Sequence, residues 1–163
     1  MTRLPLNREF ATRYALVALL FLGMAGWFGY DGLVRYPRAD AAALYRSIEK
    51  SEPGVTVDLE AFKRQKTQAQ CGLMAALLVA SAVVGLILLK AVRFRFEYDD
   101  EGFVANGVRR SWGDVRSVDR TRWEKKGILV LMLGDAAVVL DAWHHSGVAA
   151  VERLVAEKTG KQS

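Results

Sequence analysis

Hydrophobic and polar positions divide the chain into two parts of different character. Residues 14–30 and residues 67–89 contain no charged side chain. A helix of about 20 apolar residues spans the hydrocarbon core of a bilayer. After residue 91 charged residues return, and apolar positions alternate with polar ones, which is typical of half-buried β-strands. The pattern predicts a hairpin of two transmembrane helices followed by a small, mostly β domain.

The first charge-free stretch has 17 residues, which as a helix reach roughly 26 Å. Its flanks extend it, so we predict an N-terminal tail over 1–13 and a transmembrane helix over 14–34. A cleaved signal peptide is the alternative, because arginines precede the stretch and Gly23-Met24-Ala25 resembles a small-residue cleavage site. The apolar, aromatic stretch continues past that site, which favours an uncleaved anchor.

The second stretch has 23 residues, or roughly 35 Å of helix, and predicts a transmembrane helix over 67–89. Lys90, Arg93 and Arg95 follow it directly. Its Cys71 is the only cysteine, so an intrachain disulfide is excluded. Residues 14–30 and 67–89 place no charged side chain inside the bilayer, which argues against a transporter or proton path.

Small residues recur at helical spacing in both spans. Such residues allow close backbone approach where lipid supplies no hydrophobic drive for helix pairing. They either pack the two helices on each other or form a docking face for another membrane subunit. The candidate helix-packing residues are Gly23, Gly26, Gly29, Gly72, Ala76, Ala80 and Gly85.

The connecting segment, residues 35–66, carries helical signals. Asp40 is predicted to cap a short helix that ends near Lys50, before Glu52-Pro53-Gly54. Asp58 is predicted to cap a second helix that runs into the second span. This helical hairpin is either a plain connector or a contact for an outside partner. Eight basic residues near the chain ends of the spans oppose seven in the loop, so the positive-inside rule is nearly balanced.

The C-terminal part reads as six short strands and a helix. The strands are predicted over 92–98, 103–106, 108–112, 115–123, 128–133 and 136–141. Asn106-Gly107 is the strongest hairpin signal. Ser146 is predicted to cap a final helix over 147–158, whose apolar side carries Val148, Val151, Leu154 and Val155. A domain of this size needs that helix to cover an open end of its barrel or bent sheet.

Several of these segments resemble a known family. They are the turn into Gly102-Phe103, the corner from Ser111 to Val115 (SWGDV), and Trp123 before a glycine turn. Residues 92–158 are similar to the bacterial pleckstrin-homology-like (PH-like) domains, especially those attached to paired membrane helices. The resemblance implies an antiparallel β barrel with a C-terminal helix, lipid or protein binding, and a multi-pass protein of the bacterial inner membrane with both termini in the cytoplasm. It also implies seven strands, one more than the pattern predicts.

Basic residues gather in the predicted β domain. If residues 114–123 form one strand, Arg116, Arg120 and Arg122 share a face that can bind anionic lipid or an acidic partner. The alternative is a solvated face balanced by nearby carboxylates. The candidate lipid- or partner-binding residues are Arg109, Arg110, Arg116, Arg120, Arg122, Lys125 and Lys126.

His144-His145 is the only histidine pair. No third histidine and no nearby cysteine accompany it, so the sequence offers too few ligands for a zinc site. A polar loop is the simpler interpretation. No phosphate-binding loop, nucleophile elbow or paired-carboxylate motif occurs. We therefore expect no catalytic, cofactor or metal site. Residues 91–163 have 12 basic and 11 acidic side chains, which argues against nucleic-acid binding.

The sequence favours a non-enzymatic, membrane-anchored scaffold or binding protein. Its expected partners are the lipid bilayer, a membrane or cytoplasmic protein, and anionic lipid, and a homo-oligomer is compatible with the small-residue faces. The alternative is an accessory subunit of a larger integral membrane complex, in which the helices matter most. An enzyme or transporter is the least favoured class.

Overall fold

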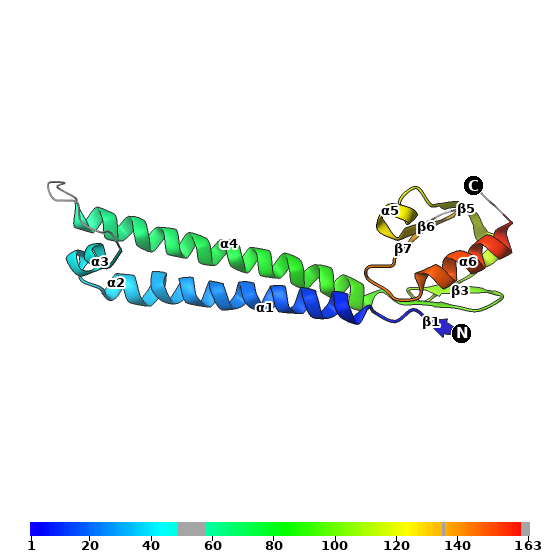
Figure 1. Cartoon of the computed structure of the whole chain (residues 1–163), viewed down its shortest axis with the longest axis horizontal. Coiled ribbons are helices and arrows are strands. Elements are labelled where there is room, and N and C mark those ends of the chain that lie inside the picture. Colours follow the sequence, from blue (N-terminus) through cyan, green and yellow to red (C-terminus); the bar gives the residue numbers. More distant parts are fainter. Residues whose placement is uncertain (49–57, 135, 161–163) are drawn as a thin grey trace. The chain divides into compact units, whose positions relative to one another are not determined.

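The computed structural model describes residues 1–48, 58–134 and 136–160 (Figure 1). The predicted helix end at Lys50, the Glu52-Pro53-Gly54 turn and Asp135 lie outside these residues. The chain forms two compact units, which are described separately. One unit comprises residues 15–85, and the other combines Met1–Tyr14 with Leu86–Ser163.

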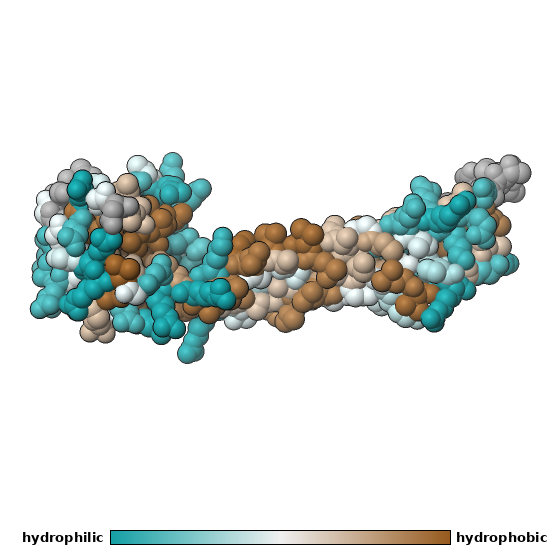
Figure 2. Space-filling view, turned by 180° about the vertical axis from the view of Figure 1, so that it is seen from behind, coloured by the Kyte–Doolittle hydropathy of each residue, from teal (hydrophilic) through white to brown (hydrophobic). Residues whose placement is uncertain are grey.

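Two helices are long and apolar enough to cross a membrane, by length and composition. Helix α1 (Arg8–Tyr30) continues through a π-helical turn, Asp31–Arg35, into α2 (Tyr36–Arg38). Helix α4 (Leu59–Arg93) has 35 residues. Both extend beyond the predicted spans, because polar residues at each end continue the same backbone hydrogen bonding. Figure 2 shows apolar side chains, mixed with residues of intermediate hydropathy, along the middle of these helices.

The unit formed by residues 15–85 contains a pair of packed helices. The hydroxyl of Ser81 on α4 donates a hydrogen bond to the carbonyl of Ala18 on α1, at 3.1 Å. A Cβ added at Gly29 would lie 2.8 Å from the sulfur of Met74, and one at Gly32 would lie 2.9 Å from the sulfur of Cys71. The Met74 side chain can move away from a larger residue at position 29, whereas at Gly32 the backbone nitrogen of Cys71 also lies within 3.1 Å of the added atom, so a small residue matters more there.

The predicted caps of the connecting helices are confirmed. The carboxylate of Asp40 accepts the backbone N–H of Ala43 at the start of α3 (Ala41–Ile48). The carboxylate of Asp58 accepts the N–H groups of Glu60 and Ala61 at the start of α4. Each cap satisfies donors that the first helical turn leaves without partners.

The other unit begins with a four-stranded antiparallel sheet in the order β1-β2-β3-β4. These strands are β1 (Thr2–Arg3), β2 (Phe96–Tyr98), β3 (Gly102–Ala105) and β4 (Val108–Ser111). The prediction of a tail over 1–13 is wrong for its start, since Thr2 pairs with Tyr98 and Arg3 with Glu97. The predicted strand from Val92 is also too long, because α4 continues to Arg93.

The predicted hairpin at Asn106-Gly107 is confirmed between β3 and β4. Both residues have a positive φ, of 50° and 87°, as the tightest hairpin turns require. Gly102, at the other end of β3, lies against β4. A Cβ added there would meet the carbonyl oxygen of Arg110 at 2.2 Å, so only glycine allows this strand pairing.

A separate three-stranded sheet has the order β5-β6-β7, with β5 (Val115–Asp119), β6 (Ile128–Leu133) and β7 (Ala137–Asp141). The prediction of one strand to Trp123 is wrong. The carboxylate of Asp119 accepts hydrogen bonds from both the N–H and the hydroxyl of Thr121, which turns the chain out of the sheet. A short helix, α5 (Trp123–Lys126), follows and ends at Gly127, whose φ is 66°.

Helix α6 (Val148–Thr159) covers the core, but its N-cap is Gly147 and not Ser146. The N–H of Ser146 instead donates to the carbonyl of Pro5. The two sheets are separate, so the expected barrel is not closed. A single core nevertheless joins both sheets and α6; it contains Leu4, Phe96, Phe103, Trp112, Val115, Leu129, Leu131, Leu133, Leu140, Val148, Val151 and Val155.

Candidate functional site

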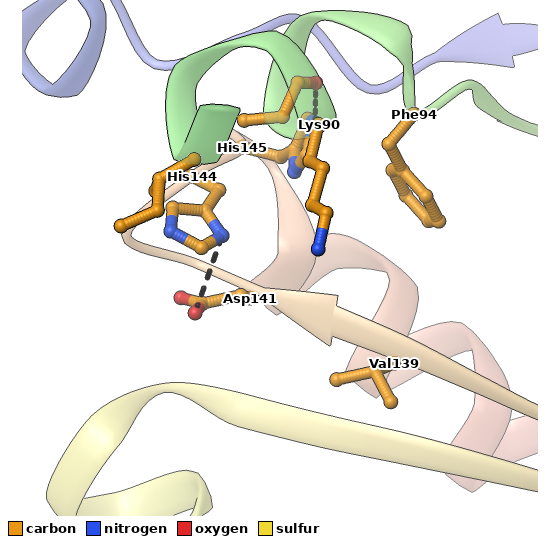
Figure 3. Close-up of a pocket in the computed structure, with 8 residues that line it drawn as sticks. Lys90, Phe94, Val139, Asp141, His144 and His145 are labelled. Atoms are coloured by element: carbon orange, nitrogen blue, oxygen red, sulfur yellow. Dashed lines mark hydrogen bonds and ion pairs between the residues drawn. The ribbon is translucent and has the colours of Figure 1, made fainter. Parts of the chain in front are cut away.

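A pocket of about 300 Å³ lies beside the C-terminal end of α4. Figure 3 shows side chains from α4, β7 and the loop after β7 facing it. Its walls are mainly apolar, and Lys90, Asp141, His144 and His145 add polar groups. The apolar residues in its lining are Ile87, Ala91, Phe94 and Val139. An apolar cavity with a few convergent polar groups is the usual form of a ligand site.

His145 fixes the loop after β7 against the end of α4. Its side chain is buried, and its Nε2 lies 3.2 Å from the carbonyl oxygen of Ala91. The nitrogen must therefore carry the hydrogen and donate. The His145 backbone also forms an isolated β-bridge with Leu6. This residue ties together three segments that are far apart in the sequence.

Burial lowers the pKa of His145 below 6.5, its ordinary value, and the neighbouring His144 adds to the effect. The hydrogen bond to Ala91 and the charge of Asp141 oppose this shift. The neutral imidazole is therefore favoured in the folded chain, because a charged ring loses hydration there.

The pKa shift of His145 predicts a pH-dependent stability. Above pH 6.5 the ring is neutral in both states, and its contribution is fully present. As the pH falls through 6.5, the unfolded chain takes up the proton first, so stability decreases. We expect the melting temperature of the full chain to fall between pH 7.5 and 5.5, with the slope expected when the unfolded state binds about one more proton than the folded state. His145→Gln keeps an N–H donor and should flatten this pH dependence.

His144→Gln is the matched control for that measurement. Its side chain is half-buried, and its Nδ1 lies near the carboxylate of Asp141. The control keeps the burial of His145, which is the largest cause of its lowered pKa, so its slope of melting temperature against pH should stay closer to wild type than that of His145→Gln. Equal slopes of melting temperature against pH for wild type and His145→Gln would contradict the assignment of this pH dependence to His145.

His144 and Asp141 form a second polar pair in the pocket. The Nδ1 of His144 lies 3.4 Å from a carboxylate oxygen of Asp141. The other carboxylate oxygen accepts the backbone N–H of Trp143 at 2.8 Å. The His144 ring also lies against Phe10, with ring centroids 4.5 Å apart. Packing and these contacts therefore hold the carboxylate and the imidazole in place.

Lys90 supplies the remaining charge of the pocket. It is the first charged residue after the charge-free stretch of α4. Figure 3 shows its side chain extending into the pocket between Phe94 and His144. Within residues 1–48, 58–134 and 136–160, no carboxylate forms an ion pair with its ammonium group.

The predicted basic face on one strand does not exist, because β5 ends at Asp119. Arg120 lies beyond the strand, and its guanidinium pairs with Glu152 of α6 at 3.0 Å. Arg116 remains on β5. Arg122 precedes α5, and Lys125 and Lys126 lie on it.

The other two basic candidates lie on β4. Arg109 lies 3.3 Å from the carboxylate of Glu101 and 3.7 Å from that of Asp99. This agrees with the alternative of a solvated face balanced by carboxylates. Arg110 is its neighbour on the same strand. The seven candidates are therefore distributed over both sheets, the turn after β5 and α5.

Only some of the candidate helix-packing residues lie at the contact between the two helices. Gly29 contacts the partner helix. Added Cβ atoms at Gly23, Gly26, Gly72 and Gly85 would meet nothing within 4 Å. Ala76 is exposed and Ala80 is half-buried on α4. Ala25, Gly32 and Ser81 are not among these candidates, but they are buried on the two helices.

His144 and His145 are the residues that the sequence analysis considered as possible metal ligands. In the part of the chain that the structure describes, no group of three or more His, Cys, Asp or Glu side chains is placed to hold an ion. His144 and His145 have ring centroids 6.4 Å apart, nearly perpendicular to each other. Each is engaged by a different partner, so the pair does not act as one chelating unit.

The pocket was not predicted from the sequence, although His144-His145 was singled out. Its charges come from Lys90 and from residues about 50 positions later, and no periodicity links them. Comparisons with protein-family models, with curated proteins and with solved structures give no match to this chain.

Proposed function

We propose that this chain is a non-enzymatic, membrane-anchored binding or scaffold protein. Helices α1 and α4 cross the bilayer, and the β-sheet unit binds a protein or lipid at the cytoplasmic face of a bacterial inner membrane. Seven strands among the described residues, followed by α6, support a PH-like domain. Strand β1 departs from the expected arrangement, because it lies outside residues 92–158 and precedes both long helices in the sequence.

One observation carries this proposal. The most apolar 18-residue stretch of α4 is only 6% buried within the protein. Leu78, Val83 and Leu86 are among its exposed large side chains. The core helix of a water-soluble protein would bury such a surface, and contiguous apolar exposure marks a membrane or partner contact.

Topology gives the direct test. Ser47 on α3 and Ser117 on β5 are both exposed, and two spans place them on opposite sides of the membrane. In a Cys71→Ala background, we expect Ser47→Cys to react with a membrane-impermeant maleimide from outside intact cells. Ser117→Cys should react only after the membrane is opened. Equal labelling of both in intact cells would contradict a two-span anchor.

A second function is an accessory subunit of a larger membrane complex. The open faces at Gly23, Gly26 and Gly72 favour it, because close helix approach needs such residues. A stoichiometric membrane partner that is lost in Gly72→Leu, while the β-sheet unit stays folded, would support this function over the first.

A further inference from the structure

The pocket beside α4 presents two opposite charges that do not neutralise each other. Lys90 and Asp141 both line it, yet no ion pair joins them. The Asp141 carboxylate keeps its place through Trp143 and His144. The pocket can therefore bind an anionic group at Lys90 and a cationic group at Asp141. A purely anionic ligand would have no group to pair with Asp141.

The rest of the lining is apolar. Ile87 and Ala91 come from α4, Phe94 follows the end of the helix, and Val139 comes from β7. A volume of about 300 Å³ suits a headgroup-sized ligand with an apolar continuation. Lys90 follows the charge-free stretch directly, so in an anchored chain it lies at the depth of lipid headgroups.

We propose that this pocket binds the headgroup of a zwitterionic phospholipid with a primary ammonium group. Lys90 binds the phosphate, and Asp141, supported by His144, accepts hydrogen bonds from the ammonium. The apolar walls contact the glycerol and the first methylenes of the acyl chains. The inference rests on the proposed function, because only an anchored chain brings the pocket to the headgroups.

Native mass spectrometry of the full chain in mild detergent tests this assignment. The probes are dihexanoyl phosphatidylethanolamine, the matching phosphatidylcholine and phosphatidylglycerol, and inorganic phosphate. We expect phosphatidylethanolamine to bind most tightly, because it alone supplies both the phosphate and N–H donors. Lys90→Gln should weaken its binding about tenfold, the effect of removing one charged hydrogen bond.

Two further variants sharpen the test. Arg93→Gln removes one positive charge from the same end of α4, but Arg93 does not line the pocket, so binding should not change. Asp141→Asn keeps an oxygen for the Trp143 N–H and should abolish the preference for phosphatidylethanolamine over phosphatidylglycerol. Circular dichroism checks that each variant is folded.

Three results would overturn the inference. They are equal binding of all three lipids, equal losses in Lys90→Gln and Arg93→Gln, and displacement of lipid by inorganic phosphate at equal concentration. The last result would assign the site to a soluble phosphate. Failure of the maleimide topology test would instead contradict the proposed membrane anchor, so a failure of the lipid site can be distinguished from a failure of the anchor.

Discussion

Phe103→Ala is expected to lower the free energy of unfolding of the β-sheet unit by about 3–5 kcal/mol. The Phe103 side chain is 0% exposed. It stacks on Phe96 with ring centroids 5.3 Å apart and contacts Trp112 at 5.0 Å. Truncation removes the central ring of this cluster and leaves a cavity that the fixed sheet cannot close. Denaturant titration of the full chain in mild detergent, followed by near-UV circular dichroism, measures the change.

Val108→Ala is the control for this experiment. Val108 lies on β4, which pairs with the strand of Phe103, but its side chain is 54% exposed. Its loss should change stability by less than about 0.5 kcal/mol. Comparable shifts for the two variants would show that Phe103 is not in a packed core.

Val79→Asp is expected to abolish stable membrane integration of the chain. Val79 lies at the middle of the charge-free stretch, and its side chain is 64% exposed. The substitution therefore leaves protein packing intact, while a carboxylate at the bilayer centre costs about 2.5–3.5 kcal/mol of insertion free energy. The fraction of chain that resists alkaline carbonate extraction from vesicles should fall sharply.

Gln68→Asp provides the comparison. Gln68 is exposed near the start of the same stretch, where a carboxylate can reach water, so extraction should resemble wild type. Wild-type resistance in Val79→Asp would contradict a bilayer-spanning α4.

The sequence predicted those features that depend on local pattern. Charge-free runs located the two long helices, Asp40 and Asp58 located the starts of the connecting helices, and Asn106-Gly107 located a hairpin. Each depends on residues close together in the chain. The physical signals are strong, because a bilayer, a helix start and a tight turn each accept few residue types.

The sequence did not predict features set by distant partners. Thr2 and Arg3 have no alternation of their own, and only pairing with β2 makes them a strand. The end of β5 depends on Asp119 and Thr121, whose turn outweighs the β-forming residues that follow. The pocket brings Lys90 to Asp141 through tertiary structure alone.

The pairing of β1 with β2 also bears on how the chain is made. Residues 2 and 3 leave the ribosome well before their partners 97 and 98, because both long helices lie between them in the sequence. Strand β1 therefore stays unpaired while the hairpin of long helices inserts. Contacts between residues this far apart in the sequence form late in folding. A bulky fusion at the N-terminus would slow this last docking step, whereas a fusion after residue 163 would leave it unhindered.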